Sequence, residues 1–325
     1  MNALIIFGLL FGLMLTGMPI SISLGLTVLT FLFGFTNTDV QTVALKLFTG
    51  IEKFEIMAIP FFILAGNFLT HGGVARRMIN FATSMVGHWH GGLGLAGVIA
   101  CALFAAVSGS SPATVVAIGS ILLPAMLKQG FPNRFGAGVI ATSGALGILI
   151  PPSIVMVMYS VATNTSVGAL FMAGVVPGLM LAGFLAFTTW YRARKFGYPR
   201  QPKATVQERI KAFRESVWGL LLIIIVIGGI YAGLFTPTEA AAMSAVYAFI
   251  VAVFIYKDMG LKDVPKVLLS SANMSAMLLY IITNAVMFSF IMTDQKIPQT
   301  LAEIMIGSGL GPITFLLMCN IVLLL

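Results

Sequence analysis

Long apolar segments follow one another through this chain, and polar residues interrupt one of them where a membrane helix would be continuous. The interruption, residues 108–114 (SGSSPAT), separates the apolar residues 93–107 from the apolar residues 115–127. A hydrocarbon bilayer offers no water to an open backbone, so such a break is stable only inside protein or beside a wet cavity. A second break, residues 143–153 (SGALGILIPPS), follows within the length of one span. Two broken apolar segments close together indicate the binding site of a membrane transporter.

The composition supports an all-α polytopic membrane protein. Hydrophobic residues make up 59% of the chain and charged residues 9%, whereas a soluble domain carries about 25% charged residues. A bilayer crossing takes about 20 apolar residues, and apolar segments of that order extend almost from end to end. We therefore expect a multi-pass protein embedded in a lipid bilayer. A soluble all-helical protein is only a remote alternative.

The net charge of +8 is concentrated in one segment. Eight of the 18 Lys and Arg residues lie there, with Glu208 as the single acid among them: Arg192, Arg194, Lys195, Arg200, Lys203, Arg209, Lys211 and Arg214. By the positive-inside rule, residues 192–215 are a basic cytoplasmic loop. We expect a solvated loop that sets the topology, rather than a lipid or nucleic-acid site.

The order of the expected elements indicates two repeats separated by this loop. The first repeat, residues 1–191, contains a re-entrant hairpin (92–127) and a broken helix (135–163). The second repeat, residues 216–325, follows the same order of apolar and amphipathic segments. An offset of 218 residues aligns the residues that interrupt the apolar segments of the two repeats. It pairs Pro19 with Pro237, Gly91 with Gly309, and Cys101 with Cys319.

The same offset carries Ser108 one position past Leu325, so we expect the second repeat to be incomplete and a second hairpin to follow in a longer protein. Residues 3–35 form either one kinked helix or two short crossings. Two crossings give the first repeat an odd number, which inverts the second repeat, as in many secondary transporters. One crossing gives a parallel repeat. We favour the inverted arrangement.

The chemistry of the breaks favours a sodium ion held by neutral oxygens. Between Leu93 and Trp190 there is no Asp, Glu or His, and the only charged residues are Lys128 and Arg134. A proton-coupled carrier usually needs an intramembrane ionisable group. Hydroxyls and freed backbone carbonyls suit a hard cation instead, and the hydroxyls available are those of Ser108, Ser110, Ser111, Thr114 and Ser153.

Pro112 fits the first turn of a helix, with Ser110 or Ser111 as its cap. The helix from Ala113 onward then directs its positive dipole end at the break. Close packing of small residues between helices is the alternative explanation.

Other candidate sites have simpler explanations. The sequence His88-Trp89-His90 is typical of an interfacial aromatic belt rather than a metal site. Glu239, three residues after Thr236, is typical of a capping box. The chain has no G-x-x-x-x-G-K-[ST] loop for nucleotide hydrolysis. We expect no enzyme activity and no cofactor or metal other than a coupling sodium ion.

Five motifs in this chain resemble the large membrane subunit of tripartite ATP-independent periplasmic (TRAP) transporters. They are residues 105–114 (AAVSGSSPAT), 144–153 (GALGILIPPS), 171–178 (FMAGVVPG), 59–66 (IPFFILAG) and 236–241 (TPTEAA). The likeness covers essentially the whole chain. Residues 66–73 (GNFLTHGG) and 88–92 (HWHGG) are most similar to the C4-dicarboxylate branch.

The resemblance implies an elevator-type symporter of the bacterial inner membrane that imports an organic acid, here a C4-dicarboxylate, with sodium. It also implies two partners: a periplasmic substrate-binding protein and a small four-helix membrane subunit. The family's sodium site corresponds to Ser108, Ser111, Gly147, Ile150 and Pro152, with Gly147 and Ile150 acting through their carbonyls. The substrate carboxylate corresponds to Ser110, Pro112, Thr114 and Ser153.

Three other functions stay open at this point. The substrate could be sialic acid or another carboxylate carried by the same kind of transporter. A symporter of anions and sodium that needs no binding protein would have a similar sequence pattern. A membrane enzyme or scaffold fits least, because the breaks lack acids and histidines.

Overall fold

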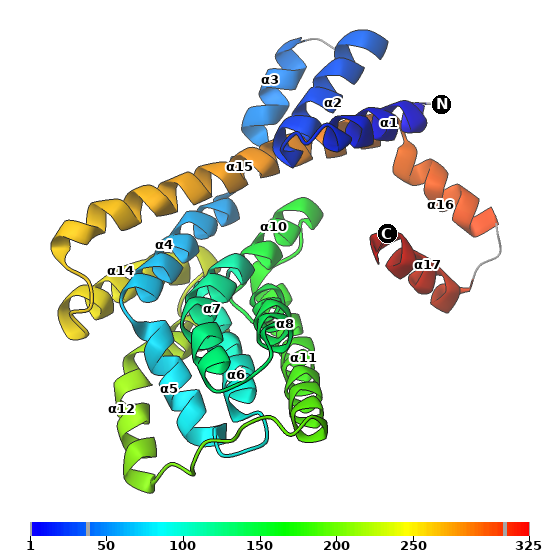
Figure 1. The fold of residues 1–325 in the computed structure, drawn as a ribbon. Coiled ribbons are helices and arrows are strands. Elements are labelled where there is room, and N and C mark those ends of the chain that lie inside the picture. The colour runs from blue at the N-terminus through cyan, green and yellow to red at the C-terminus, as the bar shows by residue number, and fades with distance from the viewer. Residues whose placement is uncertain (1, 37–39, 308–310, 325) are drawn as a thin grey trace. The chain divides into compact units, whose positions relative to one another are not determined.

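The computed structural model describes residues 2–36, 40–307 and 311–324 (Figure 1). Every regular element in these ranges is a helix, and no strand forms there. Within them, six helices are long and apolar enough to cross a membrane, or up to seven if a bent pair counts as one span. The prediction of an all-α polytopic membrane protein is confirmed.

The chain packs into two compact units, Met1–Glu52 with Met277–Leu325, and Lys53–Ala276. Each unit has its own internal contacts and is described by itself. Their boundaries differ from those of the predicted repeats, 1–191 and 216–325, because a packing unit can combine segments from both halves of a chain.

The first unit is built from short helices around the end of one long helix. Residues 3–35 form two helices that pack against each other rather than one. The helix is interrupted between them, because Gly17 takes φ +83° and because Pro19, which has no N–H, precedes the second helix. The elements are α1 Asn2–Leu15, α2 Ile20–Phe35, α3 Val40–Thr49, the end of α15 (Val264–Asp294), α16 Ile297–Gly307 and α17 Pro312–Leu324. The core of this unit joins Ile6, Val28, Phe31, Leu32, Val43, Met287, Ile291 and Ile297.

The second unit is arranged around α6, Gly92–Ser108, which contacts α4, α5, α7, α8, α9, α11 and α12 (Figure 1). Almost every residue of α6 is buried. The elements before the basic segment are η1 Phe54–Met57, α4 Ala58–His71, α5 Val74–Val86, α6, α7 Ser111–Lys128, α8 Asn133–Gly144, α9 Leu146–Leu149, α10 Ile154–Thr163 and α11 Val167–Lys195. Those after it are α12 Val206–Ile223, the π turn η2 Ile224–Gly228, α13 Gly229–Tyr231, α14 Pro237–Ile250, the π turn η3 Val251–Ile255, η4 Leu261–Asp263 and the start of α15.

Both predicted breaks are present. Helices α6 and α7 pack against each other as a hairpin, and only Gly109 and Ser110 separate them. The stretch Asn133–Leu149 and helix α10 form a broken segment that bends by 43°. The two interruptions thus lie where the polar and proline-rich motifs predict them.

Two segments differ from the expectation. Of the predicted loop 192–215, the first residues end α11 and residues 206–215 begin α12, because Thr205 and Glu208 form a capping box that starts a helix there. Residues 264–294 form one helix of 31 residues, whereas the order of segments predicted for the second repeat separates an amphipathic segment from an apolar one. This helix contains no Gly and no Pro after its first turn, so nothing in it favours a break.

The packing of equivalent helices agrees with the predicted repeat, which stays a prediction. The offset of 218 residues relates Phe31 of α2 to Phe249 of α14. Phe31 shares a core with Met287 of α15, whereas Phe249 packs edge-on against Phe68 of α4, with ring centroids 5.4 Å apart. The same offset relates α4 to the second half of α15. Helix α2 thus packs against α15, and its equivalent α14 packs against α4, the equivalent of α15. A two-fold relationship between the two halves produces such reciprocal contacts.

Candidate functional site at the two helix breaks

The ends of two broken segments meet in the second unit. Helix α6 ends at Ser108, and its cap Gly109 has a left-handed φ of +61° and an N–H that donates to Ala105 O at 2.9 Å. Helix α10 begins beside it, since Ile154 N–H donates to Gly109 O at 3.0 Å. The N-terminal ends of α7 and α10 therefore lie close to the C-terminal end of α6, which brings partial charges of both signs together.

Glycines allow the backbones to touch at this junction. A Cβ on Gly109 would lie 2.9 Å from Pro152 O, and a Cβ on Gly147 would lie 2.9 Å from Ser111 N. A Cβ on Gly66, in α4, would lie 3.1 Å from Ser108 Cβ. Because the atoms met are largely backbone atoms, a side chain at Gly109 or Gly147 would have to displace the chain itself.

The hydroxyls of the hairpin tip form a small network. Ser108 Oγ lies 3.1 Å from Thr114 Oγ1, and both residues are fully buried. Thr114 Oγ1 also donates to Ser110 O at 2.8 Å. Ser110 is the cap of α7, since its Oγ accepts from Ala113 N at 3.4 Å, and Pro112 follows in the first turn. Of the two caps that the sequence allowed, the structure selects Ser110.

Two further hydroxyls at the second break have no partner. Ser143 Oγ and Ser153 Oγ are buried and make no hydrogen bond within the described residues. An unsatisfied buried hydroxyl costs about 1–3 kcal/mol, so it calls for an explanation. A bound cation would supply the missing contact for such an oxygen, and no group of three or more His, Cys, Asp or Glu residues competes for one in the described part of the chain.

The structure brings most of the predicted ion-site residues into this junction. Ser111 touches Gly147, and Pro152 touches the glycine next to Ser108. Ile150 lies in the same turn, where its N–H donates to Leu146 O at 2.8 Å. These contacts describe positions only, and the binding role of each residue remains a prediction.

The predicted substrate residues divide into two groups. Ser110 is partly exposed and Pro112 is exposed, so both are accessible at the start of α7. Thr114 and Ser153 are fully buried and lie with the ion-site residues instead. Only the first group can touch a ligand without a rearrangement.

Several contributing residues were not among the candidates. Gly174 and Gly178 of α11 approach the second break, since a Cβ on Gly174 would lie 2.6 Å from Leu149 O and one on Gly178 would lie 2.9 Å from Ile150 Cγ1. Together with Gly66 and Ser143, they complete the wall of the junction. An isolated glycine inside an apolar helix indicates close packing, but the partner of that packing is not encoded locally.

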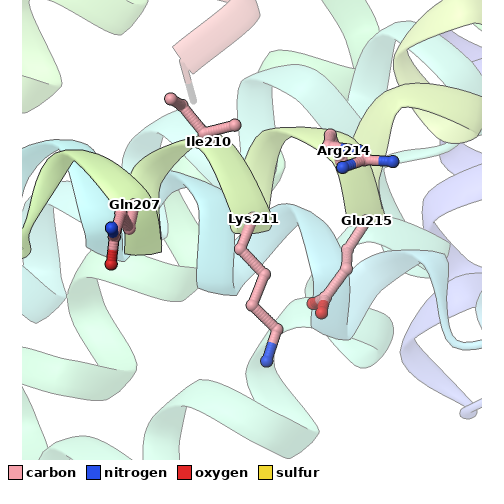
Figure 2. Close-up of a pocket in the computed structure, with 5 residues that line it drawn as sticks. All are labelled: Gln207, Ile210, Lys211, Arg214 and Glu215. Carbon is pink, nitrogen blue, oxygen red and sulfur yellow. The ribbon is translucent and has the colours of Figure 1, made fainter.

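A separate cavity of about 520 Å³ lies on α12 and involves none of the break residues. Its lining residues are Gln207, Ile210, Lys211, Arg214 and Glu215 (Figure 2). Another hollow of about 390 Å³ lies by the turn between α10 and α11, where Lys53 Nζ donates to Val161 O at 2.7 Å and to Asn164 Oδ1 at 2.5 Å.

The structure tests one of the simpler explanations given for the remaining motifs. Thr236 N–H donates to Glu239 Oε2 at 2.8 Å and Glu239 N–H donates to Thr236 Oγ1 at 3.3 Å, which confirms the capping box. His90 Nδ1 accepts from Arg200 Nε at 3.1 Å. Desolvation and the charges of Arg200 and Arg194 lower the pKa of His90 from its ordinary value, because each opposes its protonation.

A multi-pass helical membrane protein with two broken segments around one neutral polar junction has the architecture of a secondary transporter. The sequence profile of the family described as "Tripartite ATP-independent periplasmic transporter, DctM component" matches residues 7–325, and the chain belongs to this family. It is therefore a permease of the inner membrane, in a family of transporters rather than of enzymes.

Three relatives named C4-dicarboxylate TRAP transporter large permease protein DctM are similar over most of their length. The protein of Rhodobacter capsulatus is 76% identical over 338 residues, covering 100% of this chain and 77% of the relative. That of Vibrio cholerae is 48% identical over 345 residues, covering 100% and 76%. That of Pseudomonas aeruginosa is 52% identical over 303 residues, covering 93% and 71%.

Proposed function

We propose that this chain is the large membrane subunit of a TRAP transporter that imports a C4-dicarboxylate together with sodium. The names of the relatives from Rhodobacter, Vibrio and Pseudomonas support the substrate class. The observation that carries the coupling ion is the junction of the two breaks, which gathers hydroxyl and carbonyl oxygens without a titratable group. Sodium, a hard cation, prefers such oxygen ligands.

The sodium ion binds between the hairpin tip and the second break in this proposal. Ser108 and Ser111 supply oxygens from the tip, and the carbonyls of Gly147, Ile150 and Pro152 supply the others. The unpartnered hydroxyl of Ser153 lies at the same break and would gain a contact from a bound ligand. The close approach of Gly147 to Ser111 supports a shared site, because a larger residue would separate the two sets of oxygens.

The substrate carboxylate binds at the N-terminal end of α7. The first N–H groups of a helix and its dipole favour an anion there. Ser110 and Pro112 form the accessible part of this site, and Thr114 and Ser153 hold it from behind. Because the carboxylate and the sodium ion lie on either side of the same tip, each stabilises the binding of the other, and this mutual effect is the physical basis of symport.

Movement and delivery complete the proposal. The junction moves across the membrane together with its surrounding helices in an elevator-type step. The close backbone contacts at the junction support this proposal, because tightly packed helices can move as one body. A periplasmic binding protein delivers the dicarboxylate, and a small four-helix membrane subunit accompanies this chain. The family description, which names a tripartite and periplasmic transporter, supports these partners.

Uptake of labelled succinate into proteoliposomes tests the function. With the full-length permease, its small subunit and its binding protein, we expect uptake only under an inward sodium gradient. We expect Ser108→Ala to raise the half-saturating sodium concentration at least tenfold, since two or more oxygen contacts depend on this hydroxyl. Ser120→Ala is the matched control, because Ser120 is an exposed residue of α7 whose hydroxyl donates to Ala117 O of the same helix at 3.3 Å.

Two results would contradict the proposal. Uptake that continues without sodium and follows the proton gradient would exclude sodium coupling. Uptake that needs no binding protein would instead indicate a self-sufficient symporter.

A further inference from the structure

The first turns of α12 border the cavity of about 520 Å³, and the five described residues that line it all belong to this helix (Figure 2). The charge pattern alone predicted a solvated loop here. The structure instead places Lys211 and Arg214 on a helix that continues without interruption into the span Val206–Tyr231. We call Gln207, Ile210, Lys211, Arg214 and Glu215 the α12 basic surface.

Neither cation of this surface has an acidic partner among the described residues. Among the described residues, the ion pairs join only Arg76 and Arg77 to Asp258. Glu215 follows Lys211 by four residues without pairing to it, and the carboxylate of Glu208 is occupied by the N–H of its capping residue Thr205 at 2.7 Å. Lys211 and Arg214 are therefore available to an external anion.

Apolar residues on the same side of α12 are exposed along its length. Ile210 is 55% exposed in the turns that carry the cations, and Leu221, seven residues after Arg214 and so on the same side of the helix, is 37% exposed further along. Trp218, 40% exposed, lies between the two levels. Tryptophan prefers the interface between headgroups and acyl chains. From its start, α12 thus presents cations, then an interfacial aromatic, then apolar residues.

We propose that the α12 basic surface binds an anionic phospholipid of the cytoplasmic leaflet. Its phosphate lies between Lys211 and Arg214, and one acyl chain follows the exposed stripe past Trp218 toward Leu221. The depth order of the three levels matches that of a phospholipid, which neither a nucleic acid nor an acidic soluble protein would share. Basic surfaces next to membrane helices on this side recognise such headgroups. Glu215 on the same surface favours a lipid with a single negative charge, such as phosphatidylglycerol.

Native mass spectrometry of the purified full chain in neutral detergent tests this proposal with phosphatidylglycerol as the probe. Each cation near the membrane surface contributes about 1 kcal/mol to anionic lipid binding. The double variant Lys211→Gln/Arg214→Gln should therefore bind about 30-fold more weakly. Lys195→Gln/Lys203→Gln removes the same charge from exposed residues of the same basic segment and should leave binding unchanged.

The charge-conserving variant Lys211→Arg/Arg214→Lys should keep most of the binding, which separates loss of the site from loss of the fold. Equal weakening by the Lys195/Lys203 control would mean that diffuse charge attracts the lipid, and this would overturn the proposal. Equal binding of phosphatidylcholine by the unaltered chain would overturn it as well, because a phosphate without net negative charge would then suffice.

Discussion

Single atoms decide the geometry of the junction between the breaks. Gly109, Gly147 and Gly66 are conspicuous there because they lack a side chain, and each brings a backbone or a serine within contact distance of another element. The serines supply oxygens to the same small space. The site is therefore defined as much by the absent Cβ atoms as by the hydroxyls.

Replacing Gly147 by alanine should abolish transport. The new Cβ would lie 2.9 Å from Ser111 N and 3.0 Å from Ser111 Cα, and backbone atoms can yield only if the hairpin tip moves. Overpacking of this kind costs about 1–3 kcal/mol. Sodium-driven uptake and the melting temperature of the purified protein measure the two effects.

Gly138→Ala provides the control for this substitution. Gly138 is an exposed glycine of α8, and its Cβ would have no neighbour within 4 Å. Alanine is a better helix former by about 0.5–1 kcal/mol, so this variant should be unchanged or slightly more stable. Normal uptake by Gly147→Ala would show that the junction tolerates a wider spacing and is not an ion site.

Helix α10 is held at both ends, and this explains how a helix of 10 residues keeps its place beside a break. At its start, Ile154 N–H donates to Gly109 O. At its end, Asn164 takes φ +53° and Lys53 Nζ donates to Val161 O at 2.7 Å. A cation at a helix C-terminus stabilises the carbonyls that have no partner in the helix.

Removing this cap should loosen α10 and, through it, the sodium site. We expect Lys53→Met to destabilise the protein by about 1–2 kcal/mol and to raise the half-saturating sodium concentration severalfold, whereas Lys53→Arg should retain most of the function. Uptake at graded sodium concentrations and thermal unfolding measure these effects. Lys203→Met, at an exposed residue, is the control; an equal loss there, or no loss in Lys53→Met, would contradict a positioning role for Lys53.

The sequence predicted the elements whose signals are local. The cap and proline of SGSSPAT indicated the hairpin tip, and Pro151-Pro152 indicated the second break. The start of α12 inside the basic segment was missed because charge dominated the interpretation, although Thr205 and Glu208 carry the capping signal. The partners of Gly66 and Gly174 could not be predicted, because they belong to other helices and the contact exists only after packing.

At the scale of the whole molecule, charge sets the direction of the chain through the membrane. Helix α11 has 29 residues, and at about 1.5 Å per residue it exceeds the roughly 30 Å of a hydrocarbon core. Arg192, Arg194 and Lys195 lie at its end, and the turn before it, residues 164–166, carries no charge. The positive-inside rule therefore predicts that the end of α11 lies in the cytoplasm and that this turn lies on the periplasmic side.

Cysteine labelling of intact cells checks this orientation. In a Cys319→Ser background, Thr165→Cys should react with a membrane-impermeant maleimide added from outside, since Thr165 is exposed. Lys203→Cys should react only after the inner membrane is permeabilised. The native Cys101 is buried and should stay unlabelled in both cases. The opposite labelling pattern would show that the topology is inverted. The α12 basic surface would then lie at the outer leaflet and not at the cytoplasmic leaflet, where we propose the lipid.

The π turns bear on where a helix of this chain tolerates the insertion or deletion of one residue. In η2, Ile224–Gly228, and η3, Val251–Ile255, each backbone bond spans one residue more than in an α-helix. The turn η3 ends the helix that begins as α14, whereas η2 lies between α12 and α13 and holds one surplus residue within an otherwise regular helix. Deleting a single codon there restores α-helical pairing, whereas the same deletion elsewhere in α12 or α14 rotates every following side chain by about 100°. The turn η2 is therefore a place where this helix can change length by one residue and remain continuous.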